Sequence, residues 1–217
     1  MIQTKNATYL HIPKTGGTWV RHVLRPIALV KLHHQLPVPR SENVFAFVRN
    51  PWAWYVCSYN ASLYGSKDDP ANPSDPLIIA LGKKPTFEEF IWSQVAPSLL
   101  FKKKIYALFK LRQIDNALLS LAEQWIEQDI GWYQLMCDMF LENTTKVGTT
   151  ENIKNDLKEM LLLSNELTDE INNSLETMPP KNSGNIKVNY QLMYNNELQQ
   201  AVYDSSKSLI DRFNYSF

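Results

Sequence analysis

The chain has 217 residues, of which 44% are hydrophobic and 20% charged, and its 22 basic side chains balance 22 acidic ones. This composition excludes collagen-like and disordered proteins, and it argues against a protein that binds nucleic acid through its overall charge. Length and composition together predict one domain over residues 1–217. The two cysteines, Cys57 and Cys137, are too few and too far apart for a disulfide framework or a cysteine-based zinc site, and free thiols are favoured over a single disulfide.

The N-terminal segment lacks the apolar run of a signal peptide, and no stretch approaches the roughly 20 apolar residues that span a bilayer. We therefore expect a soluble, cytoplasmic protein with no transmembrane segment.

Strands and helices alternate in the first part of the chain. A short strand is expected over 7–12, followed by a helix over 18–25 that Pro26 ends. The apolar run VFAFV over 44–48 is typical of a strand buried on both faces. Asn50 is a good N-cap and Pro51 a preferred first helical residue, so a second helix is expected there.

Helices dominate the second part of the chain. Residues 65–85 carry four prolines and are expected to form a long surface loop that could close over a site. The elements expected after that loop are a helix opened by the capping box of Thr86 and Glu89, a second capping box at Ser120 and Glu123, a mostly helical stretch over 118–141 with a break at Gly131, a strand over 146–149, helices over 153–163 and 168–175, and a C-terminal helix over 198–209. The pattern predicts an α/β fold with a central parallel sheet flanked by helices and a helix-rich C-terminal half.

The segment HIPKTGGTW, residues 11–19, combines a strand end, two glycines and the start of a helix. Glycines let backbone N–H groups approach an anion closely, and the first turn of a helix adds further N–H groups and a positive dipole end. Lys14 supplies a mobile positive charge, and Thr15 and Thr18 supply hydroxyls. These features predict a cradle for a phosphate-like group; a tight turn with an incidental lysine is the alternative. The motif is not the nucleoside-triphosphate P-loop, in which the lysine follows the glycines.

The loop resembles the phosphosulfate-binding loop of sulfotransferases that use 3′-phosphoadenosine 5′-phosphosulfate (PAPS), whose K-x-G-x-T pattern is matched by Lys14, Gly16 and Thr18, followed by Trp19. Residues 44–59 (VFAFVRNPWAWYVCSY) resemble the family's 3′-phosphate-binding segment. Residues 147–157 and 190–217 resemble two weaker blocks, and all four blocks stand in the family's order. The most similar subgroup is the bacterial HIPKTGGT branch, which is related to carbohydrate sulfotransferases.

The resemblance implies a P-loop NTPase-like three-layer fold and assigns roles around the donor. Lys14 would contact the bridging oxygen and the 5′-phosphate, where charge develops in the transition state. The backbone at Thr15, Gly16 and Gly17 and the hydroxyl of Thr18 would hold the same phosphate. Trp19 would stack on the adenine; packing in the core is the alternative.

Arg49 follows the buried strand, where α/β folds place ligand groups, and the resemblance implies that it binds the 3′-phosphate. An arginine that caps neighbouring carbonyl groups is the alternative. The family has a serine eight residues further on, but here that position is Cys57 and the serine is Ser58. Neighbouring helical residues differ by about 100° in direction, so only one of the two side chains can face the phosphate easily.

The acceptor hydroxyl needs a base. The resemblance implies a histidine just before the second strand, so His34 is the first candidate and His33 the second, with two loop histidines of no role as the alternative. His11 is interpreted as a structural histidine and His22 as a mid-helix residue that could simply face solvent, and Glu42 remains a candidate because relatives can use a glutamate. No metal is expected.

The acceptor itself is left open. It could be a sugar or larger glycan, a lipid head group, or a small alcohol or amine, and nothing indicates nucleic acid as a partner. The segment over 95–112 is locally basic; it could attract an anionic glycan or an anionic membrane surface, or it could be an amphipathic helix with a solvated lysine face.

Two further functions remain open beside PAPS-dependent sulfuryl transfer. One is an ATP-dependent small-molecule kinase, which would place a phosphate at a similar loop but lacks the G-K-[ST] order. The other is a non-catalytic nucleotide-binding module, for which the cysteine at position 57 is the only support.

Overall fold

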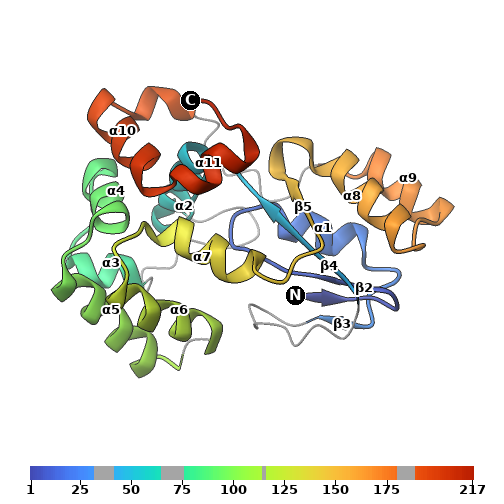
Figure 1. The fold of residues 1–217 in the computed structure, drawn as a ribbon, viewed down its shortest axis with the longest axis horizontal. Helices are drawn as coiled ribbons and strands as arrows, with labels where there is room; N and C mark the ends of the chain where they lie inside the picture. The colour runs from blue at the N-terminus through green and yellow to red at the C-terminus, as the bar shows by residue number, and fades with distance from the viewer. Residues whose placement is uncertain (32–41, 65–75, 114–115, 180–188) are drawn as a thin grey trace. The chain divides into compact units, whose positions relative to one another are not determined.

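The computed structural model describes residues 1–31, 42–64, 76–113, 116–179 and 189–217 (Figure 1). Contacts within the chain divide it into two compact units, one made of residues 1–49 with 140–182 and one of residues 50–139 with 183–217. The single domain expected from the sequence stays a prediction, and each unit is described by itself.

The first unit contains every strand of the described structure. Its elements are β1 (Ile2–Gln3), β2 (Ala7–Tyr9), α1 (Gly17–Val23), β3 (Val30–Lys31), β4 (Asn43–Val48), β5 (Lys146–Thr149), a 3₁₀ turn η1 (Thr150–Asn152), α8 (Ile153–Leu163) and α9 (Asp169–Thr177). The expected strand over 146–149 and helix over 153–163 are confirmed at those residues, whereas the expected helix over 18–25 is shorter and ends at Val23.

The sheet has the strand order β3-β1-β2-β4-β5 (Figure 1). Strands β2, β4 and β5 are parallel, with Tyr9 opposite Phe45 and Val48 opposite Thr149. The two short strands β1 and β3 pair antiparallel at one edge. The α/β class and the parallel centre of the sheet are confirmed; the antiparallel edge was not expected, because strands of two residues leave too little pattern to recognise.

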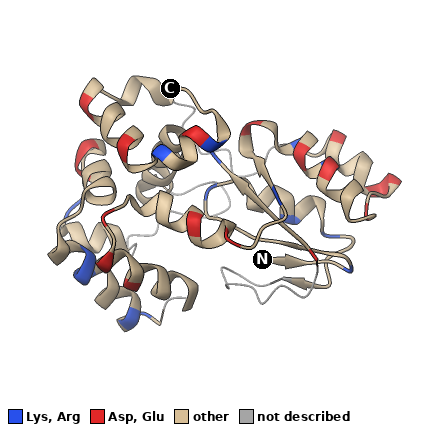
Figure 2. Cartoon of the chain, in the orientation of Figure 1, with Lys and Arg blue, Asp and Glu red and all other residues tan. Residues whose placement is uncertain are grey.

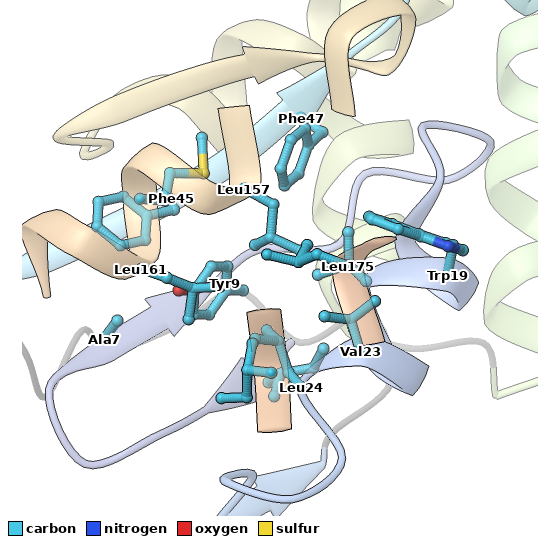
Figure 3. Packing of buried hydrophobic residues seen from close by; sticks show 14 residues of the cluster. Ala7, Tyr9, Trp19, Val23, Leu24, Phe45, Phe47, Leu157, Leu161 and Leu175 are labelled. Atoms are coloured by element: carbon cyan, nitrogen blue, oxygen red, sulfur yellow. The ribbon is translucent and has the colours of Figure 1, made fainter. Parts of the chain in front are cut away.

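One face of this sheet packs against three helices. Side chains two residues apart on a strand point to the same face, and Ala7 and Tyr9 of β2 join Phe45 and Phe47 of β4 in this way. Figure 3 shows these strands meeting apolar residues of α1, α8 and α9, among them Val23, Leu157, Leu161 and Leu175, together with Leu24 just after α1. The cluster fixes β2, β4 and α1 relative to one another, and these elements carry the glycine-containing loop.

The second unit is helical where the structure describes it. Its elements are α2 (Pro51–Tyr64), α3 (Pro76–Leu81), α4 (Phe87–Val95), α5 (Leu99–Leu111), α6 (Asn116–Glu127), α7 (Trp132–Leu141, whose end extends into the first unit), a 3₁₀ turn η2 (Tyr190–Met193), α10 (Asn196–Ser205) and α11 (Lys207–Phe213). Buried aromatic rings hold it together: Trp54 of α2 stacks on Tyr133 of α7 at 4.3 Å between centroids.

The helix ends test the capping predictions. The Asn50 side chain accepts from the N–H of Trp52 and so caps α2, and the capping box of Thr86 and Glu89 is confirmed at the start of α4. The second expected capping box is wrong, because Ser120 lies inside α6, which begins four residues earlier at Asn116.

One of the remaining helical expectations is confirmed and one is corrected. The helical stretch over 118–141 is confirmed with its break, since α6 ends at Glu127 and α7 begins after Gly131. The expected C-terminal helix is instead two helices, α10 and α11, separated at Ser206. Residues 65–75 of the expected loop lie outside the described residues, and its later part contains α3.

Candidate functional site

The loop between β2 and α1 is a tight turn with two residues in the left-handed region. Lys14 has φ 64° and Gly16 has φ 84°. Between them Thr15 is 1% exposed, and its hydroxyl donates to the carbonyl of Ile12 at 2.8 Å. The first bonds of α1 run from the N–H groups of Trp19 and Val20 to the Gly16 carbonyl. Hydrogen bonds within the segment thus hold the turn in place. The Thr15 hydroxyl, which was expected to contact a ligand, donates to a backbone carbonyl of the loop instead.

Both glycines are required by close packing. A Cβ atom at Gly16 would overlap the Cδ1 atom of Ile153 in α8, and a Cβ atom at Gly17 would overlap the imidazole ring of His11. Glycine therefore lets the loop backbone lie directly against α8 on one side and against the end of β2 on the other.

Arg49 reaches the same loop from the neighbouring strand. It follows β4, and its Nη1 donates to the carbonyl oxygen of Lys14 at 3.4 Å. This contact follows from the topology, because parallel strands β2 and β4 end at the same edge of the sheet. A contact to a backbone carbonyl is what the capping alternative predicts, and binding of a 3′-phosphate by Arg49 stays a prediction.

The end of β5 joins this edge. The Thr150 hydroxyl donates to the carbonyl of Val48 at 2.9 Å, and the Thr150 methyl would lie 3.9 Å from a Cβ atom at Gly16. Sequence reasoning singled out residues 147–157 only as a weak block and gave Thr150 no part. The signal that could have found it is its place directly after a strand parallel to β4.

The helix after the loop contributes less than expected. α1 has only seven residues, and Gly16 at its N-terminus makes no side-chain cap. Two turns of helix carry a small dipole, so an anion at this loop would depend on the Lys14 and Arg49 charges and on the loop backbone rather than on the helix.

Trp19 is part of the hydrophobic core. Its side chain is 4% exposed, lies in the cluster with Val23 and Leu175, and donates its indole N–H to the carbonyl of Met178 at 3.3 Å (Figure 3). The expected stacking on adenine is replaced by the packing alternative, because a ring with so little exposed surface and a satisfied N–H has no free face for a ligand.

The candidate bases differ in their positions. His33 and His34 lie outside the described residues, so their role stays a prediction. The His22 Nδ1 lies 2.7 Å from the carbonyl of Thr18 one turn earlier, and the residue is half-buried rather than fully turned to solvent. The His11 ring packs on Gly17, as the glycine contacts require.

Glu42 is removed from the candidates. It precedes Asn43, the first residue of β4, and Arg49 follows the last. A strand rises about 3.3 Å per residue, so Glu42 and Arg49 are separated by the length of the strand, about 20 Å. Glu42 is thus at the opposite edge of the sheet from the lysine and the arginine.

Cys57 and Ser58 lie on α2 in the second unit. Cys57 is a free thiol, as is Cys137. Cys57 is half-buried, and Ser58 is 8% exposed. That only one of these two side chains can face a phosphate stays a prediction.

A small pocket lies beside the loop, lined by residues that include His11, Thr15, Gly17 and Arg21. Its volume of about 30 Å³ is close to that of one water molecule, and neither Lys14 nor Arg49 lines it. A nucleotide does not fit this pocket, so the candidate site is the outer surface of the loop at Lys14 and Arg49. In the described part of the chain, no group of three His, Cys, Asp or Glu side chains could hold a metal ion.

Comparisons with known proteins add no assignment: no protein-family model, no curated protein and no solved structure matches the chain. Among the described residues, no helix is long and apolar enough to cross a membrane.

Proposed function

We propose that the protein is a sulfotransferase that moves a sulfuryl group from PAPS to an acceptor hydroxyl. The observation that carries the proposal is the position of Arg49 beside the two-glycine turn, where its Nη1 donates to the carbonyl oxygen of Lys14 at the carboxyl ends of β2 and β4. The resemblance of residues 11–19 and 44–59 to the PAPS-dependent family supports the choice of donor. The parallel strands at the centre of the sheet are compatible with the P-loop NTPase-like three-layer fold of that family.

Lys14 would stabilise the charge that develops on the donor. In the reaction the acceptor oxygen forms a bond to sulfur, while the bond from sulfur to the 5′-phosphate oxygen breaks. The leaving phosphate gains negative charge as that bond lengthens, so a fixed ammonium stabilises the transition state more than the bound donor. The backbone at Thr15, Gly16 and Gly17 and the Thr18 hydroxyl would hold the same phosphate.

Arg49 would hold the 3′-phosphate, which distinguishes this donor from ATP. A guanidinium binds phosphate through two parallel hydrogen bonds, and the contact to Lys14 couples its position to the loop. His34, or failing that His33, would accept the acceptor's proton. The acceptor class stays open among a glycan, a lipid head group and a small alcohol or amine.

The first test is ligand binding by calorimetry with adenosine 3′,5′-bisphosphate, adenosine 5′-phosphate and ATP with magnesium. We expect the bisphosphate to bind most tightly. Arg49→Ala should weaken the bisphosphate about 10- to 150-fold, since a hydrogen bond to a charged group contributes roughly 1.5–3 kcal/mol, and should leave adenosine 5′-phosphate nearly unchanged. The matched control is Arg25→Ala, because Arg25 is exposed and follows the far end of α1. Equal losses for both nucleotides would refute the 3′-phosphate role, and preference for ATP would favour a kinase.

The second test replaces Lys14 by glycine, which changes both the charge and the backbone preference at this position. Lys14→Gly removes the ammonium and also relieves the left-handed conformation at φ 64°. We expect a protein about 1 kcal/mol more stable that nevertheless loses bisphosphate binding and donor turnover. The control Lys5→Gly removes an exposed lysine of the same unit and should leave binding intact. Unchanged binding in Lys14→Gly would contradict the role of the lysine.

A further inference from the structure

Helix α5 exposes large apolar side chains on one face. Leu100 and Leu111 are 78% and 79% exposed, and Leu99, about 100° away around the helix from Leu100, is 52% exposed. Other residues of the same helix, Ile105 and Phe109, are buried against the second unit, so α5 is firmly docked by one side while leucines remain on the other. Exposed leucines that gather on one helix face are unusual enough to indicate a contact surface.

The exposed leucines form a stripe with positive charge beside it. At 100° per residue, Leu100, Ala107 and Leu111 lie within about 40° of one another around the helix axis. Lys103 and Lys110 fall within about 20° of each other on one flank of that stripe. We call these five residues the α5 face; all five are exposed. Figure 2 shows the basic residues of this helix, whose sequence contains no acidic residue.

The basic residues of α5 divide into two groups. Lys102 is 5% exposed and donates to the carbonyl of Gln128 at 2.6 Å, just past the C-terminus of α6, and Lys104 donates to the carbonyl of Ala80 at 2.6 Å. These two lysines therefore stabilise the neighbouring helices. The ion pairs between described residues do not involve Lys103 or Lys110, whose charges face solvent.

We propose that the α5 face binds to the surface of an anionic lipid bilayer, with α5 lying in the plane of the interface. Leucines would enter the boundary between headgroups and acyl chains, and the flanking lysines would contact anionic headgroups. An anionic glycan would match the lysines but would leave the leucines exposed to water. The apolar stripe thus decides between the two anionic partners. The proposal is independent of the sulfuryl-transfer chemistry and would hold the protein at a membrane without a spanning segment.

The test is co-sedimentation of the full chain with vesicles of phosphatidylcholine alone and with 30% phosphatidylglycerol. We expect binding only to the anionic vesicles, weakened as salt rises from low to physiological concentration. Lys103→Gln with Lys110→Gln should weaken binding about 25-fold, since each charge near such a surface contributes about fivefold. Leu100→Ser with Leu111→Ser should weaken it by about tenfold or more, although it changes no charge.

Matched controls come from the other unit. Leu162 and Leu163 of α8 are each 57% exposed, and Lys5 and Lys154 are exposed lysines. Leu162→Ser with Leu163→Ser, and Lys5→Gln with Lys154→Gln, should leave vesicle binding unchanged. Thermal unfolding of each variant shows that it is folded.

Several results would overturn the proposal. These are the absence of binding to anionic vesicles, equal binding to neutral vesicles, or equal losses in the α5 and control variants. Binding to soluble heparin that survives the leucine substitutions while vesicle binding is absent would assign the face to a glycan. A dimer in sedimentation velocity that disappears in Leu100→Ser with Leu111→Ser would assign it to a second copy of the chain.

Discussion

Replacing Gly16 by alanine tests whether the loop conformation is set by close packing on α8. Two costs are expected. Alanine in the left-handed region costs about 1–2 kcal/mol, and Gly16 has φ 84°. The added methyl would also overlap the Cδ1 atom of Ile153, and overpacking of this kind costs about 1–3 kcal/mol. The sum predicts that Gly16→Ala lowers the free energy of unfolding by about 2–5 kcal/mol.

Gly82 separates the two costs. It has φ 73°, close to that of Gly16, but a Cβ atom there would meet nothing within 4 Å. Gly82→Ala should therefore show the backbone cost alone, about 1–2 kcal/mol. Urea denaturation followed by tryptophan fluorescence gives both values, and the difference between them measures the packing contact.

Ile153 provides the decisive step. Ile153→Val removes the Cδ1 atom that the new methyl would meet and by itself should cost about 0.5–1.5 kcal/mol. The double variant Gly16→Ala with Ile153→Val should then be about 1–3 kcal/mol more stable than the sum of the single changes predicts. Additive effects, or a Gly16→Ala no more costly than Gly82→Ala, would show that the loop does not pack on α8 as described.

Three further predictions concern buried groups. Trp19→Ala should destabilise the protein by about 3–5 kcal/mol, and Trp19→Phe should destabilise it less. Calorimetry on the folded Trp19→Phe variant should show bisphosphate affinity within about twofold of the unchanged protein. A loss of affinity without a loss of stability would restore the adenine-stacking role. Burial raises the pKa of the Cys137 thiol, so the thiolate needed for attack stays scarce up to alkaline pH, and a thiol reagent at pH 8 should label only Cys57 in the native protein but both cysteines in urea. Lys102→Met should lower the free energy of unfolding, measured by urea denaturation, by about 1.5–3 kcal/mol, because it removes a hydrogen bond from a charged group. Lys103→Met should change that free energy by less than about 0.5 kcal/mol. Equal effects of the two substitutions would contradict the division of the α5 lysines into two groups.

The sequence predicts the parallel centre of the sheet because its signals are local. The apolar run of β4 and the two glycines before α1 each occupy a few adjacent residues, and the alternation of strand and helix then places Lys14 near Arg49. The antiparallel edge formed by β1 and β3 depends on pairing between segments of two residues, which leave no recognisable pattern.

The errors at the candidate site have one physical cause. Whether Trp19 stacks on a ligand or packs in the core depends on the distant residues Leu175 and Met178, which only the folded chain brings to it. The same holds for the Thr15 hydroxyl, which the turn itself uses. Residue type and spacing identify which groups could bind an anion, but tertiary contacts decide which of them are free to do so.

The backbone of Lys14 distinguishes this loop from the other strained positions of the described chain. Non-glycine residues with positive φ also occur at Gln113 and Asn165, each two residues after the last residue of a helix, and at Asn214, which directly follows one. A left-handed residue there is an ordinary way of ending a helix, and asparagine tolerates the conformation well. Lys14 instead lies between a strand and a helix, and it carries a long side chain for which the conformation is unfavourable. Such strain persists where the surrounding contacts enforce it, and here they do so through Thr15, Gly16 and Arg49. The conformation of Lys14 is thus a second reason, separate from sequence resemblance, to seek the activity of the protein at this turn.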